Sequence, residues 1–198
     1  MSLSAIAKTK SWISSISYSW TNQRVGSLLK ILLASLFIGI SAQIEIPLYF
    51  TPVPLTVQTP AVMLVGIILG SRKGAFATLC YLLEGSVGLP VWAGGSSGIV
   101  HLLGPTGGYL FGFVILAYLS GWLLEKQKNL SLFTITAALL ISTLVHLSIG
   151  SLWLAQFVGI ENSFKLGFHP FIFGDVAKAL LLAIYVKNRQ SRTLKSQI

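Results

Sequence analysis

The chain has 198 residues, of which 54% are hydrophobic and 10% are charged. A soluble domain carries about 25% charged residues, so this composition indicates a membrane protein, and the length suits one compact bundle. The formal net charge of +9 does not indicate nucleic-acid binding, because the lysines and arginines cluster between apolar runs. The single cysteine, Cys80, lies inside an apolar run and offers neither an intrachain disulfide nor a metal cluster.

The first 26 residues combine Lys8, Lys10 and Arg24 with many serines and have no continuous apolar core. This pattern is not that of a secretory signal peptide. We therefore predict a cytoplasmic or interfacial segment over 1–26, with residues 11–20 as an interfacial helix.

Six apolar segments follow, at 27–42, 56–70, 74–92, 106–124, 132–157 and 168–187. Several approach the roughly 20 residues that a helix needs to cross a bilayer. The segments predict an all-α membrane protein, with a six-helix transmembrane substrate-binding domain over 27–187 and a basic tail over 188–198. Both termini are expected in the cytoplasm, because all of the 14 lysines and arginines except Lys165 and Lys178 then fall on the inner side.

The external loops are apolar and rich in glycine, as in VWAGGSSGIVHLLGPTGG at 91–108. Such a loop satisfies its backbone polar groups by folding back onto protein rather than into lipid. We expect it to lie over the bundle and cover a pocket.

The last apolar segment contains PFIFGDVAKALLLAIY, in which the only charged residues are Asp175 and Lys178. Positions three apart share one helix face, and each charge costs about 2.5–3.5 kcal/mol near the centre of a membrane span. A structural ion pair is one interpretation. We favour the other, in which the pair presents an acceptor and a donor to a polar ligand arriving from outside.

Further polar residues lie within apolar segments. Thr56 and Gln58 are candidate ligand contacts. The role of Glu84 stays open among pairing with Lys178, carrying a proton and snorkelling toward loop groups. His146 and Gln156 are expected to form hydrogen bonds between helices, and His101 to be a satisfied loop histidine.

The sequence lacks the motifs of several enzyme classes. GPTGGY at 104–109 lacks the lysine of a phosphate-binding loop, so the chain is not expected to hydrolyse ATP. The motifs H-E-x-x-H and G-x-S-x-G are also missing. We predict a protein that is not an enzyme and that holds neither a metal nor a cofactor.

Four blocks carry a resemblance to a known family: SAQIEIPLYFTPVPLTVQTPAVMLVGIILG at 41–70, YLLEGSVGLPVWAGGSSG at 81–98, LLGPTGGYLFGF at 102–113 and PFIFGDVAKA at 170–179. In this order and spacing the chain resembles the BioY family, the biotin-binding S components of energy-coupling-factor (ECF) vitamin transporters. The resemblance covers about residues 28–186 and implies a six-helix bundle that binds biotin near the external side of the plasma membrane.

The resemblance also implies site residues. The Asp-x-x-Lys of the last helix carries over to Asp175 and Lys178, with Asp175 on the ureido end of biotin and the contact of Lys178 left open. The glycine-rich blocks point to Trp92, where phenylalanine is commoner in the family, and to Gly94, Gly95 and Tyr109 as pocket wall and lid.

The family further implies a membrane coupling subunit and two ATPases as partners, and homo-oligomers are possible. Small residues four apart, Ser35 and Gly39 with Ala34 nearby, are candidates for the docking face. The same small residues alternatively pack spans within one protein. Three other functions compete: a stand-alone facilitator or proton-coupled transporter, an S component for another vitamin, and a structural membrane protein.

Overall fold

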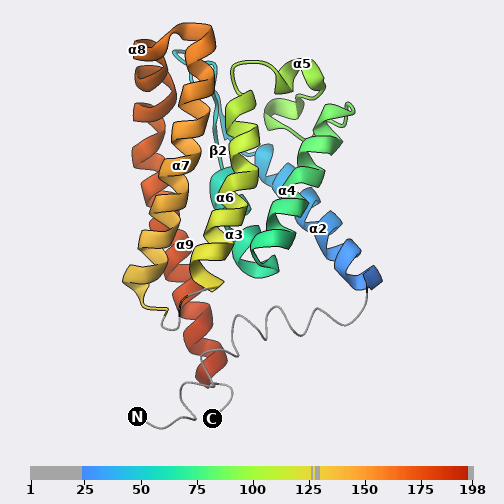
Figure 1. The fold of residues 1–198 in the computed structure, drawn as a ribbon, viewed down its shortest axis with the longest axis vertical. Helices are drawn as coiled ribbons and strands as arrows, with labels where there is room; N and C mark the ends of the chain where they lie inside the picture. The colour runs from blue at the N-terminus through green and yellow to red at the C-terminus, as the bar shows by residue number, and fades with distance from the viewer. Residues whose placement is uncertain (1–23, 126, 128–129, 196–198) are drawn as a thin grey trace.

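The structure is a computed structural model that describes residues 24–125, 127 and 130–195. The predicted interfacial helix at 11–20 lies outside these residues. Six longer helices form the body: α2 (Arg24–Ala42), α3 (Gln58–Leu69), α4 (Ser71–Ser86), α6 (Gly107–Glu125), α7 (Leu132–Val158) and α9 (His169–Lys195). Figure 1 shows them as one helical bundle.

Each predicted apolar segment overlaps one of these helices. By length and composition, three stretches of the described residues are able to cross a membrane: Gly107–Glu125, Leu132–Val158 and Ile160–Gln190. Helices α2 and α3 are shorter or less apolar, so six membrane crossings remain a prediction.

One predicted boundary was wrong. The segment expected at 74–92 is helical only to Ser86. The chain leaves the helix at Val87 and reverses at Gly88, whose φ of +102° is a conformation that glycine adopts at little cost. As a result Trp92 lies on a loop and is not on the helix.

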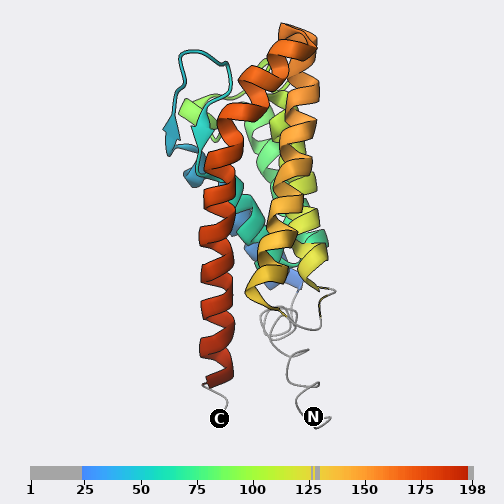
Figure 2. The same ribbon diagram turned by 90° about the vertical axis from the view of Figure 1, so that its left-hand side faces the viewer.

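Short elements connect the long helices at one end of the bundle. They are the antiparallel strands β1 (Glu45–Ile46) and β2 (Leu55–Thr56), the turn η1 (Ala93–Gly95), α5 (Ile99–Leu102), α8 (Ile160–Ser163) and the π-helical turn η2 (Phe164–Phe168). Figure 2 shows the β1–β2 loop and α8 at this end, with the last turns of α9 at the opposite end.

The opposite end is closely packed through glycine. A methyl group on Gly74 in α4 would lie 2.6 Å from the Cα of Gly66 in α3, and one on Gly121 in α6 would lie 2.5 Å from the Gly66 carbonyl oxygen. Nearby, Ser71 at the start of α4 donates its backbone N–H and its hydroxyl to the two carboxylate oxygens of Glu125, at 2.7 and 3.0 Å. These contacts fix α3, α4 and α6 relative to one another.

Candidate functional site

A cavity of about 300 Å³ lies within the end of the bundle that carries the short elements. Its wall is formed by the loop between α2 and α3 (residues 43–57, the first loop), the start of α3, the segment between α4 and α6, and parts of α6, α7 and α9. The lining residues are Glu45, Pro47, Leu48, Thr51, Pro52, Val53, Pro54, Thr56, Gln58, Thr59, Trp92, Ala93, His101, Thr106, Tyr109, Leu110, Phe113, His146, Leu147, Phe171, Asp175 and Lys178. A largely apolar cavity with a few polar groups is typical of a small-molecule site.

The charged pair on α9 faces this cavity. The Lys178 Nζ donates to Asp175 Oδ1 and to the Thr56 carbonyl oxygen, at 2.8 Å in both cases. The Asp175 side chain is 4% exposed and that of Lys178 is 19% exposed. The two predicted interpretations are therefore not exclusive, because the residues form an ion pair and also line a cavity. Pairing lowers the cost of keeping both charges inside the bundle.

The first loop supplies the other predicted polar residues. Thr56 accepts a hydrogen bond from the backbone N–H of Gln58 through its Oγ1, and Gln58 Nε2 donates to the Tyr81 hydroxyl at 2.7 Å. Both Thr56 and Gln58 line the cavity. The loop residues that lie between β1 and Thr56 form a larger part of the cavity wall than the sequence predicted.

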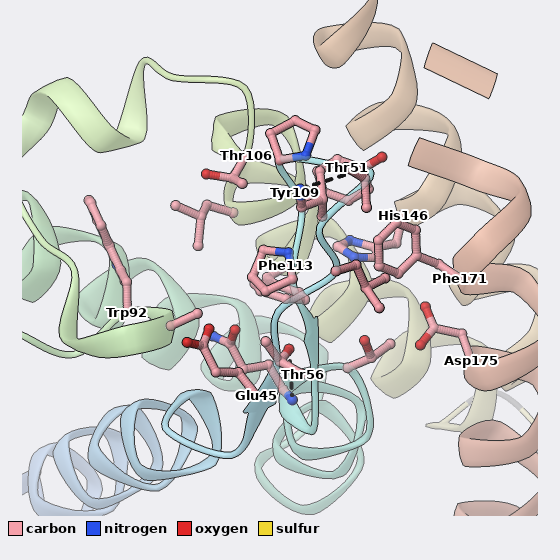
Figure 3. A pocket seen from close by; sticks show the side chains of 18 of the residues that line it. Glu45, Thr51, Thr56, Trp92, Thr106, Tyr109, Phe113, His146, Phe171 and Asp175 are labelled. Atoms are coloured by element: carbon pink, nitrogen blue, oxygen red, sulfur yellow. Dashed lines mark hydrogen bonds between the residues drawn. The ribbon is translucent and has the colours of Figure 1, made fainter. Parts of the chain in front are cut away.

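Aromatic rings form the apolar wall (Figure 3). Phe113 stacks on His146 with ring centroids 4.7 Å apart, and Tyr109 lies 6.3 Å from Phe171. The Tyr109 hydroxyl donates to the Gly167 carbonyl oxygen at 2.7 Å, which holds the ring in place. His146, expected to connect helices, thus contributes a ring to the cavity, whereas Gln156 is exposed on α7.

Trp92 and His101 form the side of the cavity away from α9. Their ring centroids are 5.5 Å apart, and the Trp92 side chain is fully buried. His101 Nε2 lies 3.3 Å from both Ser96 Oγ and Thr106 Oγ1, and burial lowers the pKa of the imidazole. A neutral His101 held by two hydroxyls agrees with the satisfied loop histidine that the sequence predicted.

Gly94 and Gly95 do not line the cavity. Their φ angles of +63° and +69° form the η1 turn, which a side chain would strain. The turn directs Trp92 and Ala93 into the wall, so the two glycines act on the site through the backbone.

The predicted docking residues face the interior of this chain. Ala34 is 8% and Ser35 0% exposed, and a methyl group on Gly39 would lie 3.3 Å from Val91. Ser35 Oγ donates to the Glu84 carboxylate at 2.5 and 2.6 Å, so the partner of Glu84 is Ser35 and not Lys178. In the structure these small residues contact α4 and the segment that follows it, and the docking of a coupling subunit on them stays a prediction.

The residues that the sequence did not single out belong mainly to the first loop. Glu45 and Thr51 line the cavity together with the prolines of IPLYFTPVP. The sequence did contain one indication that this loop folds inward. Its proline-rich apolar stretch lies beside two polar candidates, Thr56 and Gln58.

Within the described residues, an apolar helical bundle carries a cavity with aromatic walls and a buried charged pair, an arrangement typical of integral membrane proteins that bind small solutes. The sequence profile of the BioY family matches residues 10–195. The chain belongs to the BioY family, which confirms the resemblance seen in the sequence.

Relatives and one solved structure agree with this assignment. The chain is 41% identical to biotin transporter BioY2 of Lactococcus lactis, covering 83% of this chain and 90% of the relative. It is 40% identical to a probable biotin transporter BioY of Pyrococcus horikoshii, covering 81% and 96%. A crystal structure of the S component for biotin from an ECF-type ABC transporter matches with a TM-score of 0.76 and 30% identity, covering 86% and 94%.

Proposed function

We propose that this protein captures biotin at the external side of the plasma membrane, as the substrate-binding subunit of an ECF-type transporter. The observation that carries the proposal is the Asp175–Lys178 pair, which lines a cavity of about 300 Å³. The similarity to a solved S component for biotin and to biotin transporters supports the choice of ligand.

The chemistry of biotin matches the cavity. Its ureido ring carries N–H donors and a carbonyl, its thioether ring is apolar, and its valerate chain ends in a carboxylate. An ionised Asp175 accepts a ureido N–H in a charge-assisted hydrogen bond, and the neighbouring Lys178 Nζ donates to the ureido carbonyl. The rings of Trp92, Tyr109 and Phe113 enclose the thioether ring.

The distribution of charge supports an external cavity. Among the described basic residues, Arg72, Lys73, Lys187 and Arg189 lie toward the end of the bundle opposite the cavity. Basic residues concentrate on the cytoplasmic side of membrane proteins. This arrangement supports a cavity on the external side, with the start of α2 and the end of α9 toward the cytoplasm.

Energy for uptake is assigned to partner ATPases, through a membrane coupling subunit that contacts α2. The exposed face of α2 consists of large apolar side chains: Leu28, Leu29, Leu32, Leu33, Leu36, Phe37 and Ile40. A membrane helix of a coupling subunit fits such a face, and the chain itself has no phosphate-binding lysine after GPTGG.

Calorimetric titration of biotin into the purified protein in detergent tests the proposal, with Asp175→Asn and Lys178→Ala measured in parallel. Tight binding by the parent and its loss in both variants is expected. A folded parent that does not bind biotin would contradict the proposal and leave the pair as a structural ion pair.

A proton-coupled carrier is a second candidate, because Glu84 places a carboxylate within an apolar segment with Ser35 as its hydrogen-bond donor. Liposomes that contain only this protein separate the two functions. Accumulation of biotin driven by a proton gradient would support the carrier and contradict the need for partner ATPases.

A further inference from the structure

Glu45 is a carboxylate in the cavity wall that the proposed function does not use. It is the first residue of β1, is half-buried, and lines the cavity. Within residues 24–125, 127 and 130–195, the ion pair of the structure is Lys178–Asp175, and Glu45 has no cationic partner. A half-buried carboxylate without a partner retains its full capacity to accept hydrogen bonds.

The fold directs this carboxylate toward the cavity. Glu45 pairs with Thr56 in the two-residue ladder of β1 and β2, which fixes its backbone at the base of the first loop. On its other side lies the η1 turn, where a methyl group on Gly94 would be 2.9 Å from Glu45 Oε1. The absence of a side chain at Gly94 therefore leaves the space that the Glu45 carboxylate occupies.

Glu45 and Asp175 lie on either side of Thr56 in Figure 3. All three charged residues belong to one cavity wall: the backbone of Glu45 pairs with that of Thr56 in the ladder, and the Thr56 carbonyl and Asp175 both accept from Lys178 Nζ. The cavity wall thus carries two carboxylate acceptors, Glu45 and Asp175, and one ammonium donor, Lys178.

A cyclic urea presents the complementary pattern, with an N–H donor on each side of one carbonyl acceptor. Satisfying all three groups requires two acceptors that flank one donor. Asp175 and Lys178 satisfy only one N–H and the carbonyl, and a buried N–H that stays unpaired lowers affinity.

We propose that Glu45 accepts the second ureido N–H and so selects for an intact cyclic urea in this end of the cavity. This inference rests on the proposed function. The same carboxylate repels an anionic group, so it also disfavours the reversed orientation, in which the valerate carboxylate would lie beside Glu45.

The test compares ligands that differ in one N–H. Biotin and its two isomers methylated at one or the other ureido nitrogen are titrated calorimetrically into the parent, Glu45→Ala and Glu45→Gln. Glu161→Ala is the matched control, because it removes an exposed carboxylate from α8 at the same end of the bundle. The melting temperature of each variant without ligand shows that the fold is retained.

We expect Glu45→Ala to weaken biotin binding about ten- to a hundredfold, the range for a hydrogen bond to a charged group. Glu45→Gln is expected to lose less, because the amide oxygen still accepts, and Glu161→Ala to lose nothing. One methylated isomer binds the parent weakly and is insensitive to Glu45→Ala. The other isomer loses affinity as biotin does.

Two results would overturn the inference while leaving the proposed function intact. One is equal affinity of the parent and Glu45→Ala for biotin. The other is tighter binding of biotin by Glu45→Ala with no change for biotin amide, which would place Glu45 beside the valerate. If the folded parent does not bind biotin at all, the proposed function fails and the inference fails with it.

Discussion

The two ends of the bundle use polar groups in opposite ways. At the end formed by α3, α4 and α6, the Glu125 carboxylate is satisfied by Ser71 of the same chain, and glycines bring the helices into contact. At the end with the short elements, Glu45 has no cationic partner among the described residues and a cavity lies beneath it. The comparison separates a carboxylate whose two oxygens both accept from donors of the same chain, Glu125, from one in the cavity wall that has no cationic partner, Glu45.

The largest expected effect concerns the packed end. Gly66→Ala places a methyl group against the Ala117 carbonyl and 2.6 Å from Ser120 Oγ, and backbone cannot move aside as a flexible side chain can. Overpacking costs about 1–3 kcal/mol and occasionally more, and the clash with backbone predicts the upper end of this range. Thermal unfolding in detergent measures the loss.

The control is Gly26→Ala in α2, where nothing lies within 4 Å of the added methyl group. It is expected to leave stability unchanged or to raise it by less than about 1 kcal/mol, since alanine favours helix over glycine. Equal melting temperatures for the two variants would show that the packed end is not rigid.

The next effect concerns the cavity end. Asp175→Asn removes the negative charge that pairs with Lys178 and the charged acceptor for a ureido N–H. A loss of about a hundredfold in biotin affinity is expected, equivalent to about 2.7 kcal/mol. Titration calorimetry measures it, and unchanged affinity would mean that Asp175 serves only to hold Lys178.

A smaller effect sharpens the comparison between carboxylates. Glu125→Gln weakens the cap on the first turn of α4 and is expected to cost about 1 kcal/mol of stability without changing biotin affinity. Glu45→Ala is expected to weaken biotin binding without lowering stability. The melting temperature and the dissociation constant for biotin are measured for both variants. A change in biotin affinity for Glu125→Gln would contradict the assignment of this carboxylate to stability alone.

The smallest effect is a dependence on pH. Burial lowers the pKa of His101 in the folded protein, so the unfolded chain binds a proton more readily. Stability from this residue is present above the ordinary histidine pKa of about 6.5 and decreases as the pH falls below it. The melting temperature should therefore be slightly lower at pH 5 than at pH 7. In His101→Gln this decrease in melting temperature should be smaller.

The sequence predicted the helices well because hydropathy reports directly on long apolar segments. It also located Asp175 and Lys178, since charges are rare in such segments, and Trp92, Tyr109, Thr56 and Gln58 all line the cavity. It missed Glu45 because the β1–β2 ladder has only two pairs and leaves no periodic pattern.

The glycines show a different limit of sequence reasoning. The family resemblance implied Gly94 and Gly95 as part of the pocket wall and lid, but in the structure they provide the positive φ angles of a turn and do not line the cavity. Ala34, Ser35 and Gly39 likewise pack inside the chain. A small residue in a sequence marks close packing or an unusual backbone conformation, and only the structure shows which neighbour it accommodates.

Lys178 has a limited capacity to bind a ligand. An ammonium group has three N–H donors, and Asp175 Oδ1 and the Thr56 carbonyl already accept from two of them. One donor remains, and the pair as a whole carries no net charge. A neutral carbonyl is satisfied by one hydrogen bond, whereas a carboxylate at this position would meet no uncompensated positive charge. If the pair contacts the ligand as we propose, it favours a neutral group over an anionic one, and the carboxylate of biotin lies elsewhere in the cavity.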